Sequence, residues 1–337
     1  MRRSWFLRLL AGMAMTPFCF ALAWAQTPFY EGKAITILIG TQGGGSIVAA
    51  RIIAQHIGKY IAGKPAVLVQ PMVGGAHIVA SNHVFNTAKP DGLTLLAANP
   101  NIAVAQLIKL DGVRFDVRKF EWLGSSGSDG VVLTIRSDLP YKSFDELRKA
   151  DREMVVGTTG PGSNAHDFPL MLKEFAGAKF KIVSGYPANS DILLAVERKE
   201  VDIWTAFAAT VRPVVERGAV RPLVRARVPS PGFEHLPIDE NLTPHPVGKA
   251  LMGIKGAPLA IGRAIAAPPG TPPDRVALLR EALAKVLKDP GLEADGRKAK
   301  LDFRHIPGDE VLKGISAILL QSPDVQKEMV KYIKFGG

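Results

Sequence analysis

The chain has 337 residues, a single cysteine and a formal net charge of +11. This length allows a sizeable core and corresponds to about two ordinary domains. The positive charge suits an anionic ligand, but Lys and Arg are spread along the chain without a basic block or an aromatic-interleaved basic stretch. We therefore expect no nucleic-acid binding.

The first 25 residues, MRRSWFLRLLAGMAMTPFCFALAWA, predict a secretory signal peptide. Three arginines precede an apolar stretch that ends in the small-residue pattern Ala-Trp-Ala, with cleavage expected before Gln26. A membrane anchor is disfavoured because the stretch is shorter than the ~20 residues of a spanning helix. Cleavage removes Cys19, so the mature chain has no thiol for a disulfide, a metal or catalysis. We expect a soluble protein in the periplasm.

Apolar runs of strand length then alternate with amphipathic helices. The first set has strands at 35–40, 66–72 and 93–99 and helices at 47–61, 79–88 and 103–108. The second set has strands at 131–135, 154–159, 179–186 and 201–207 and helices at 143–150, 167–177 and 190–200. This rhythm predicts parallel sheets with crossover helices.

The pattern of the first set returns near residue 260. A strand, a Pro-rich turn and a long helix follow, and the helix is opened at Thr271 by Pro272 and Pro273. The return predicts an α/β protein of two lobes with a ligand cleft between them. We place lobe 1 at 26–128 and 260–337 and lobe 2 at 129–259, with hinge crossings near 125–130 and 255–262.

The stretch GTQGGGS follows the first predicted strand and precedes a helix. Glycines there let the backbone approach a ligand, while free amides and the helix dipole favour an anion. A dinucleotide fingerprint is not met, because Ala49 or Ala50 occupies its last position, and no Gly-Lys-Ser/Thr follows as in a P-loop. An anion cradle and a purely structural turn both remain open.

Comparable loops follow other strands, at 71–77, 97–101, 158–166 and 186–191. The ends of strands in such sheets face the ligand crevice, so several polar loops at one cleft favour a binding site. The expected ligand contacts are Thr41, Gln42, Gly43, Gly44, Gly45, Ser46, Gly75, Ala76, His77, Asn99, Ser125, Gly162, Ser163, Asn164, His166, Tyr186, Asp191, Thr205 and Phe207.

Several of these side chains have structural alternatives. Ser46 also suits a helix N-cap, and His77 and His166 also suit capping or packing. Tyr186 either offers its hydroxyl to the cleft or packs the wall between the lobes. Phe207, like its neighbour Trp204, is either core packing or an apolar wall for the ligand. These alternatives stay open.

Catalytic patterns are absent from the sequence. Gly124 and Gly127 do not form a G-x-S-x-G elbow, because Ser128 stands where the last glycine is needed. No H-E-x-x-H occurs, and the spacing of the histidines builds no metal site. We expect a protein that is not an enzyme and binds no metal.

Taken in order, several stretches resemble the solute receptors of tripartite tricarboxylate transporters, the Bug-type periplasmic binding proteins. They are YEGKAITILIGTQGGGSIVAARIIAQHI, KPDGLTLLAAN, FEWLGS, GTTGPGSNAHDFPLML, KIVSGYPANSDILLAVERKEVD and APPGTPPDRVALLREAL. The resemblance implies a type II, Venus-flytrap fold that closes around a small organic acid and delivers it to membrane subunits. It implies no cofactor, and we expect a monomer. A periplasmic sensor that presents its ligand to a signalling partner is the alternative.

The chain departs from the family pattern in its loops. Ile47 stands where an aspartate is usual, and Gln42 where proline is common. In the second loop Ala76 replaces a common glycine, and His77 stands where Asn or Ser is frequent. The missing aspartate implies a more apolar site that disfavours ligands with an amine.

Overall fold

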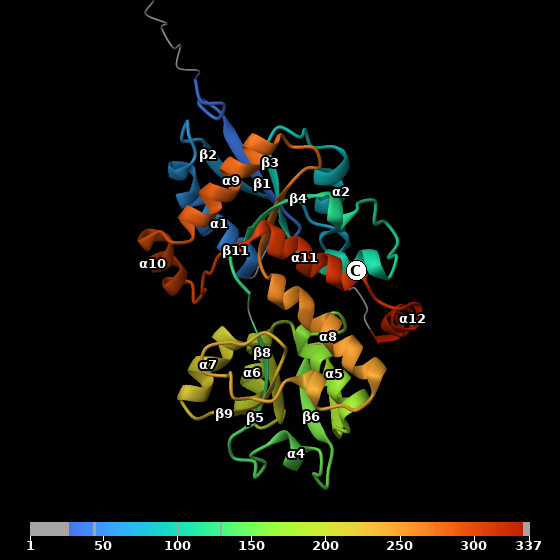
Figure 1. Ribbon diagram of the computed structural model, residues 1–337. Helices are drawn as coiled ribbons and strands as arrows, with labels where there is room; N and C mark the ends of the chain where they lie inside the picture. The colour runs from blue at the N-terminus through green and yellow to red at the C-terminus, as the bar shows by residue number, and fades with distance from the viewer. Residues whose placement is uncertain (1–26, 43–44, 100, 129, 333–337) are drawn as a thin grey trace, which may run out of the picture.

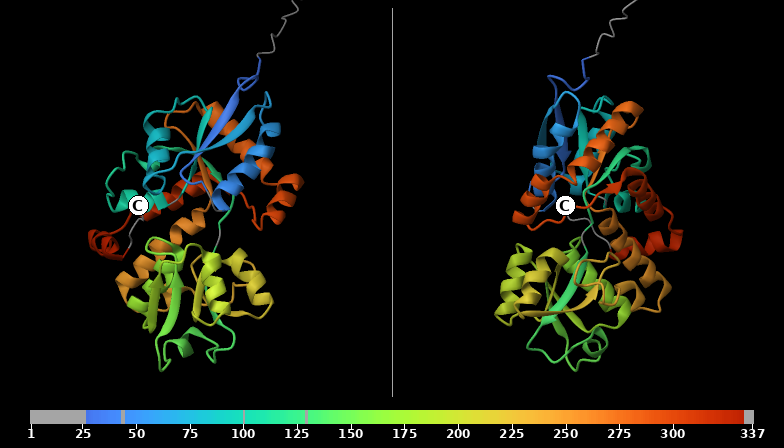
Figure 2. Two further views of the ribbon diagram at one scale, coloured as in Figure 1. Left: turned by 180° about the vertical axis from the view of Figure 1, so that it is seen from behind. Right: turned by 60° about the vertical axis from the view of Figure 1, so that its left-hand side comes forward.

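The computed structural model describes residues 27–42, 45–99, 101–128 and 130–332. Two α/β lobes lie one above the other in Figure 1, and Figure 2 shows the same arrangement from two further sides, with the crossing segments and helices between the lobes. The predicted signal peptide lies outside the described residues. Within the described part of the chain, no helix combines the length and the apolar character needed to cross a membrane.

The first lobe contains a six-stranded sheet of order β11-β4-β10-β3-β1-β2. Its strands are β1 (Ala34–Ile39), β2 (Ala66–Pro71), β3 (Thr94–Ala98), β4 (Glu121–Ser125), β10 (Ala264–Ala267) and β11 (Ile306–Pro307). The β1 strand is parallel to β2 and β3, as predicted. The β10 strand is antiparallel to β3 and β4, so the prediction of a wholly parallel sheet was wrong for the strand that returns from the second lobe.

The two faces of this sheet are covered by the helices α1 (Gly45–Ile57), α2 (Ile78–Asn86), α3 (Asn101–Leu107), α9 (Pro273–Val286) and α11 (Gly308–Leu319). Helix α10 (Pro290–Lys298) packs on α1, and α12 (Pro323–Tyr332) packs on α8 (Pro246–Ile261). Alternate residues of β1 point to opposite faces: Ile35 and Ile37 pack with α1 and α9, whereas Leu38 packs with α2, α3 and α11. The chain passes from the carboxyl end of β1 into α1, and from the carboxyl end of β3 into α3, at the edge of the sheet that faces the second lobe.

The second lobe contains a five-stranded sheet of order β7-β6-β8-β5-β9. Its elements are β5 (Val131–Arg136), α4 (Phe144–Leu147), β6 (Met154–Thr158), α5 (Asn164–Ala176), β7 (Phe180–Ser184), α6 (Asn189–Glu197), β8 (Ile203–Phe207), α7 (Ala208–Glu216) and β9 (Val220–Arg225). The β6 strand is parallel to β7 and β8, as predicted, but β5 is antiparallel to β8 and β9, so the prediction of a parallel sheet was wrong for β5. The α5 helix packs on one face, and α6 and α7 pack on the other.

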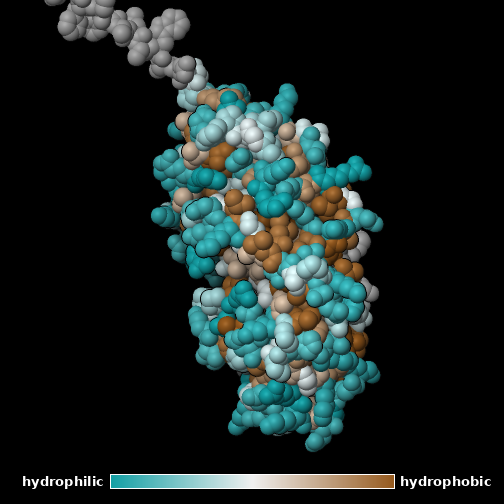
Figure 3. Space-filling model, turned by 45° about the vertical axis from the view of Figure 1, so that its right-hand side comes forward, coloured by the Kyte–Doolittle hydropathy of each residue, from teal (hydrophilic) through white to brown (hydrophobic). Residues whose placement is uncertain are grey.

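Helix α8 (Pro246–Ile261) joins the lobes. It packs against α5 of the second lobe and against α3 and α11 of the first. Its buried residues Leu251, Met252 and Ile254 belong to an apolar cluster that extends into both lobes. Figure 3 shows one face of the molecule, on which apolar residues gather around the middle.

The chain crosses between the lobes twice, and the two crossings are hydrogen-bonded to each other. The amide of Arg263 donates to the carbonyl of Gly127 at 3.1 Å, and the amide of Ser126 donates to the carbonyl of Arg263 at 3.0 Å. Gly262 has a φ of +66°, and a Cβ there would lie 1.9 Å from the Gly127 oxygen. Only glycine fits this contact, so the close approach of the crossings depends on it.

Candidate functional site

A cavity of about 560 Å³ lies between the lobes, within the ~300–1,000 Å³ range of small-molecule sites. Strand ends and helix starts of both lobes line it, as the sheet topology predicts. Eight of the residues predicted as ligand contacts are among its lining: Gly45, Ser46, His77, Asn99, Gly162, Ser163, Asn164 and Phe207.

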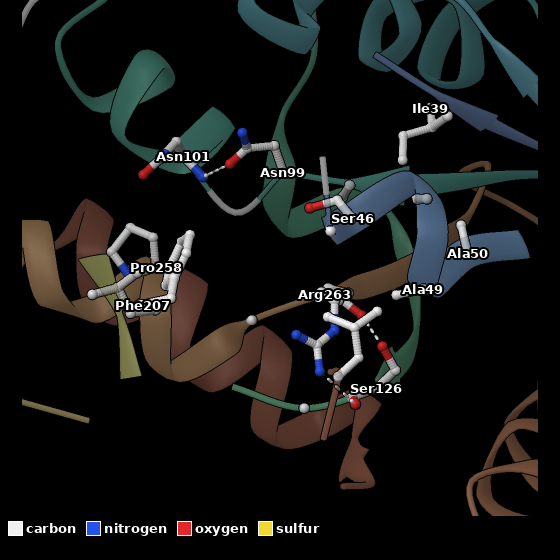
Figure 4. Close-up of a pocket in the computed structure, with 18 of the residues that line it drawn as sticks. Ile39, Ser46, Ala49, Ala50, Asn99, Asn101, Ser126, Phe207, Pro258 and Arg263 are labelled. Carbon is white, nitrogen blue, oxygen red and sulfur yellow. Dashed lines mark hydrogen bonds between the residues drawn. The ribbon is translucent and has the colours of Figure 1, made fainter. Parts of the chain in front are cut away.

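Several helices begin at this cavity. The first residues of α1, α3 and α5 line it, as do Ala209 and Thr210 at the start of α7. Asn99 caps α3, because its side-chain oxygen accepts from the Asn101 amide at 3.0 Å (Figure 4). Helix N-termini carry free amides and a partial positive charge. Their convergence makes the cavity attractive to an anion.

The charged side chains that line the cavity are both cations. They are Arg263, at the second crossing, and Lys300, an exposed residue after α10. The Arg263 guanidinium donates to the carbonyls of Ser126 and Asp302 and lies 5.6 Å from the centre of the Phe303 ring. No Asp or Glu is among the described residues of the lining. The site is therefore electropositive, and these contacts fix the position of the Arg263 guanidinium.

His77 lines the cavity in an unusual backbone conformation. Its φ is +76°, and it packs over Gly40, where a Cβ would come within 2.5 Å of the His77 Cα. Burial lowers the pKa of His77, which favours the neutral ring at neutral pH. His77 can therefore contribute a hydrogen bond to a ligand but not a full charge.

A buried network holds the cavity loop of the second lobe. Asp167 accepts from the Gly162 amide at 3.0 Å, from His166 Nδ1 at 2.9 Å and from Lys255 Nζ at 2.8 Å. Burial raises the pKa of Asp167, but these hydrogen bonds and the Lys255 charge outweigh burial, so the pKa lies below its usual value. Asp167 stays ionised and fixes the loop that carries Gly162 and Ser163.

The remaining second-lobe candidates lie outside the cavity lining. His166 bonds to Asp167, and Tyr186 packs over Gly157. The Asp191 carboxylate accepts from the Ala188 amide and caps α6. Thr205 is buried in β8, with its carbonyl accepting from Asn189. The Trp204 ring is also buried and donates to Asn189. These positions have structural roles that capping and packing patterns also predict.

The first-lobe candidates divide in the same way. Thr41, Gln42 and Gly75 lie outside the lining. Ser125 is buried, and its hydroxyl accepts from the Gly127 amide at 3.3 Å, whereas its neighbour Ser126 lines the cavity. Gly43 and Gly44 lie outside the described residues, and so does the side chain of Ala76.

Sequence reasoning missed several lining residues. Ser126 lies within the first predicted crossing, whereas Arg263 lies one residue beyond the range predicted for the second. Thr210 follows Phe207 in a helix that the alternating pattern did not reveal. Pro258 belongs to α8, which does not begin at the end of a strand. Figure 4 shows Pro258 and Phe207 on the opposite side of the view from Ala50.

Comparisons with known proteins identify relatives of this fold. A family model described as the tripartite tricarboxylate transporter family receptor matches residues 49–306. A UPF0065 protein of Bordetella bronchiseptica is 26% identical over 278 residues, covering 80% of this chain and 77% of the relative.

Two solved structures share the two-lobed architecture. A TctC solute-binding protein from Polaromonas, without ligand, aligns with a TM-score of 0.70 and 19% identity over 90% of this chain and 99% of its own. MatC from Rhodopseudomonas palustris, with bound malate, aligns with a TM-score of 0.58 and 20% identity over 88% of this chain and 99% of its own. The likenesses confirm the predicted two-lobed α/β fold.

Proposed function

This chain belongs to the tripartite tricarboxylate transporter receptor family, and we propose that its cavity captures a small organic acid by its carboxylate. The lobes then close on the ligand and deliver it to the membrane subunits of the transporter. We further propose that the protein is exported to the periplasm as a monomer, after loss of residues 1–25. The family match favours transport over the alternative of a ligand-presenting sensor.

One observation carries the choice of an anionic ligand. Four helix starts and the cations Arg263 and Lys300 surround a cavity whose described lining has no carboxylate. A bound carboxylate supplies the negative charge that such a site lacks, and it accepts hydrogen bonds from amides, hydroxyls and the guanidinium. MatC, which has the same fold, is a malate-bound protein and supports this ligand class.

The energetics favour binding by both lobes. Hydrogen bonds to a charged group contribute about 1.5–3 kcal/mol each, so three from one lobe give roughly 5–9 kcal/mol gross. Association itself costs about 4–15 kcal/mol. Micromolar affinity needs about −8 kcal/mol net, so the loop at Gly162 and Ser163 must add contacts when the lobes close.

A ligand panel tests the proposal. Mono-, di- and tricarboxylates are screened against the mature protein by thermal shift and then by calorimetry, each beside a primary amine of the same carbon skeleton. We expect at least one acid to raise the melting temperature, because a ligand at 100 times its Kd adds ~2.7 kcal/mol, and we expect no amine to do so. Stabilisation by amines, with none by any acid, would contradict the proposal.

A further inference from the structure

The cavity has an apolar wall built by the first-lobe sheet. Ile39 pairs with Ala97 across β1 and β3, and Ala97 pairs with Ile265 across β3 and β10. Residues directly opposite on paired strands point to the same face, and all three line the cavity. They form a continuous apolar row across three neighbouring strands.

Helix α1 presents a matching apolar stripe. Ala49, Ala50 and Ile53 line the cavity and recur at helical spacing, so they share one side of the helix. Both alanines end at a methyl group and are at most 4% exposed, so a larger side chain at either position would take up space in the cavity. Leu301, with Ala299, closes the space, and the Cβ position of Gly45 lies 3.5 Å from Leu301 Cδ2.

We call this space the α1 compartment. Its members are Ile39, Ala49, Ala50, Ile53, Ala97, Ile265, Ala299 and Leu301. Ile47 is buried in a cluster with Ile39 and Ala50. The compartment thus has apolar walls and an apolar backing.

Polar side chains are found in another part of the cavity. Figure 4 shows Asn99 and Asn101 across the view from Ile39 and Ala50, and Arg263 lies on the second crossing. The cavity therefore offers polar groups and a cation outside the α1 compartment, whereas Lys300 lies in the chain between Ala299 and Leu301. A second carboxylate inside the α1 compartment would lose its hydration among apolar side chains.

We propose that the ligand is a monocarboxylate with an extended hydrocarbon body. Its carboxylate binds at the Asn99, Asn101 and Arg263 end, and its hydrocarbon part fills the α1 compartment. This inference rests on the proposed function and specifies the substrate class of the same site. It separates the ligand from hydrophilic di- and tricarboxylates, whose far ends carry charge.

Calorimetry with two ligand series tests the inference. Straight-chain monocarboxylates from butanoate to octanoate are compared with α,ω-dicarboxylates of equal carbon number. We expect monocarboxylate affinity to rise by about fourfold per methylene until the compartment is full. Each dicarboxylate should bind on the order of tenfold more weakly than the monocarboxylate of equal length, because of its second charge.

Two variants change the compartment in opposite directions. Ala50→Leu fills it, so the gain with chain length should disappear while butanoate binding persists. Leu301→Ala enlarges it, so the best chain length should increase. Val48→Leu is the matched control on α1, because Val48 is 37% exposed and does not line the cavity. It should leave the series unchanged, and circular dichroism checks that each variant is folded.

The outcomes separate this inference from the proposed function. The monocarboxylate assignment is overturned if affinity is independent of chain length, or if dicarboxylates bind more tightly through Lys300. In either case the proposed function as a carboxylate receptor still holds. Failure of folded protein to bind any carboxylate overturns both. If Ala50→Leu does not fold, Leu301→Ala decides, and an unchanged chain-length preference in that variant contradicts the inference.

Discussion

The two lobes contribute unlike halves to one cavity. The first lobe supplies Arg263, Lys300 and the apolar row on its sheet, whereas the second supplies a loop and the exposed ring of Phe207. The first-lobe wall is held by the sheet itself, but the second-lobe loop depends on the hydrogen bonds of Asp167 and on its ion pair with Lys255. The two halves of the cavity therefore have separate structural supports, so each can be perturbed without the other.

The largest effect is expected from Asp167→Ala in the second lobe. The change leaves Lys255 partly buried without its partner and releases the Gly162 amide. Breaking a buried pair in this way costs about 3–5 kcal/mol of unfolding free energy. Urea denaturation measures the loss, and Asp145→Ala, at an exposed i,i+3 pair with Arg148, is the control, with an expected loss of ~0.5 kcal/mol. Equal losses in the two variants would show that the buried Asp167–Lys255 pair contributes no more to stability than the exposed pair.

Asp239 gives the stability of the second lobe a dependence on pH. Burial raises its pKa to about 7, with Glu240 adding to the shift and Arg227 opposing it. The folded protein therefore keeps a proton that the unfolded chain loses near pH 4. This contribution to stability is complete below pH 4 and is lost as the pH rises through 7.

Replacing that carboxyl removes the titration. Asp239→Asn should be more stable than the parent protein at pH 8 by about 4 kcal/mol, given ~1.36 kcal/mol for each of roughly three pKa units. The gain should shrink toward zero at pH 4, where the parent is protonated. Chemical denaturation at pH 4, 6 and 8 measures it. A stability difference that does not change with pH would show that Asp239 does not titrate in this range.

A smaller effect is expected on ligand affinity, and it compares the contributions of the two lobes to binding. Arg263→Met should weaken binding of the best carboxylate by about 2 kcal/mol, or roughly thirtyfold, since a charge-assisted contact is lost. Ser163→Ala should cost less, because its hydroxyl already donates to the Gly160 carbonyl and accepts from the His166 amide. Calorimetry compares the two, with Arg304→Met, at an exposed residue outside the lining, as the control. A greater loss in Ser163→Ala would reverse the assignment of the anchoring lobe.

Periodicity in the sequence predicted much of the fold. Strands such as 35–40 and 154–159 were found because short apolar runs ended at glycine-rich turns, and the structure places β1 and β6 there. Strand direction was not predictable in the same way. The β10 strand reads like any buried strand, and its antiparallel pairing follows from the long return through α8, which local pattern does not encode.

The candidate site was partly predictable for a related reason. Loops at strand ends carry a visible signal of Gly, Asn and Ser, and Ser46, Asn99 and Asn164 from such loops line the cavity. Arg263 carries no such signal, because its position depends on how two distant crossings meet. The apolar row of Ile39, Ala97 and Ile265 was likewise hidden, since it exists only through strand register.

The hydrogen-bonded crossings at Gly127 and Gly262 have a mechanical consequence. Two connections that run together act as a single pivot, and a rotation about a pivot moves each atom in proportion to its distance from the axis. In the proposed closure, Arg263 would move little because it lies on the pivot, whereas α4, at the far end of the second lobe in Figure 1, would sweep the longest arc. A carboxylate bound at Arg263, as proposed, would therefore stay nearly still while the outer surface is displaced, so binding of a small ligand would produce a large change of shape.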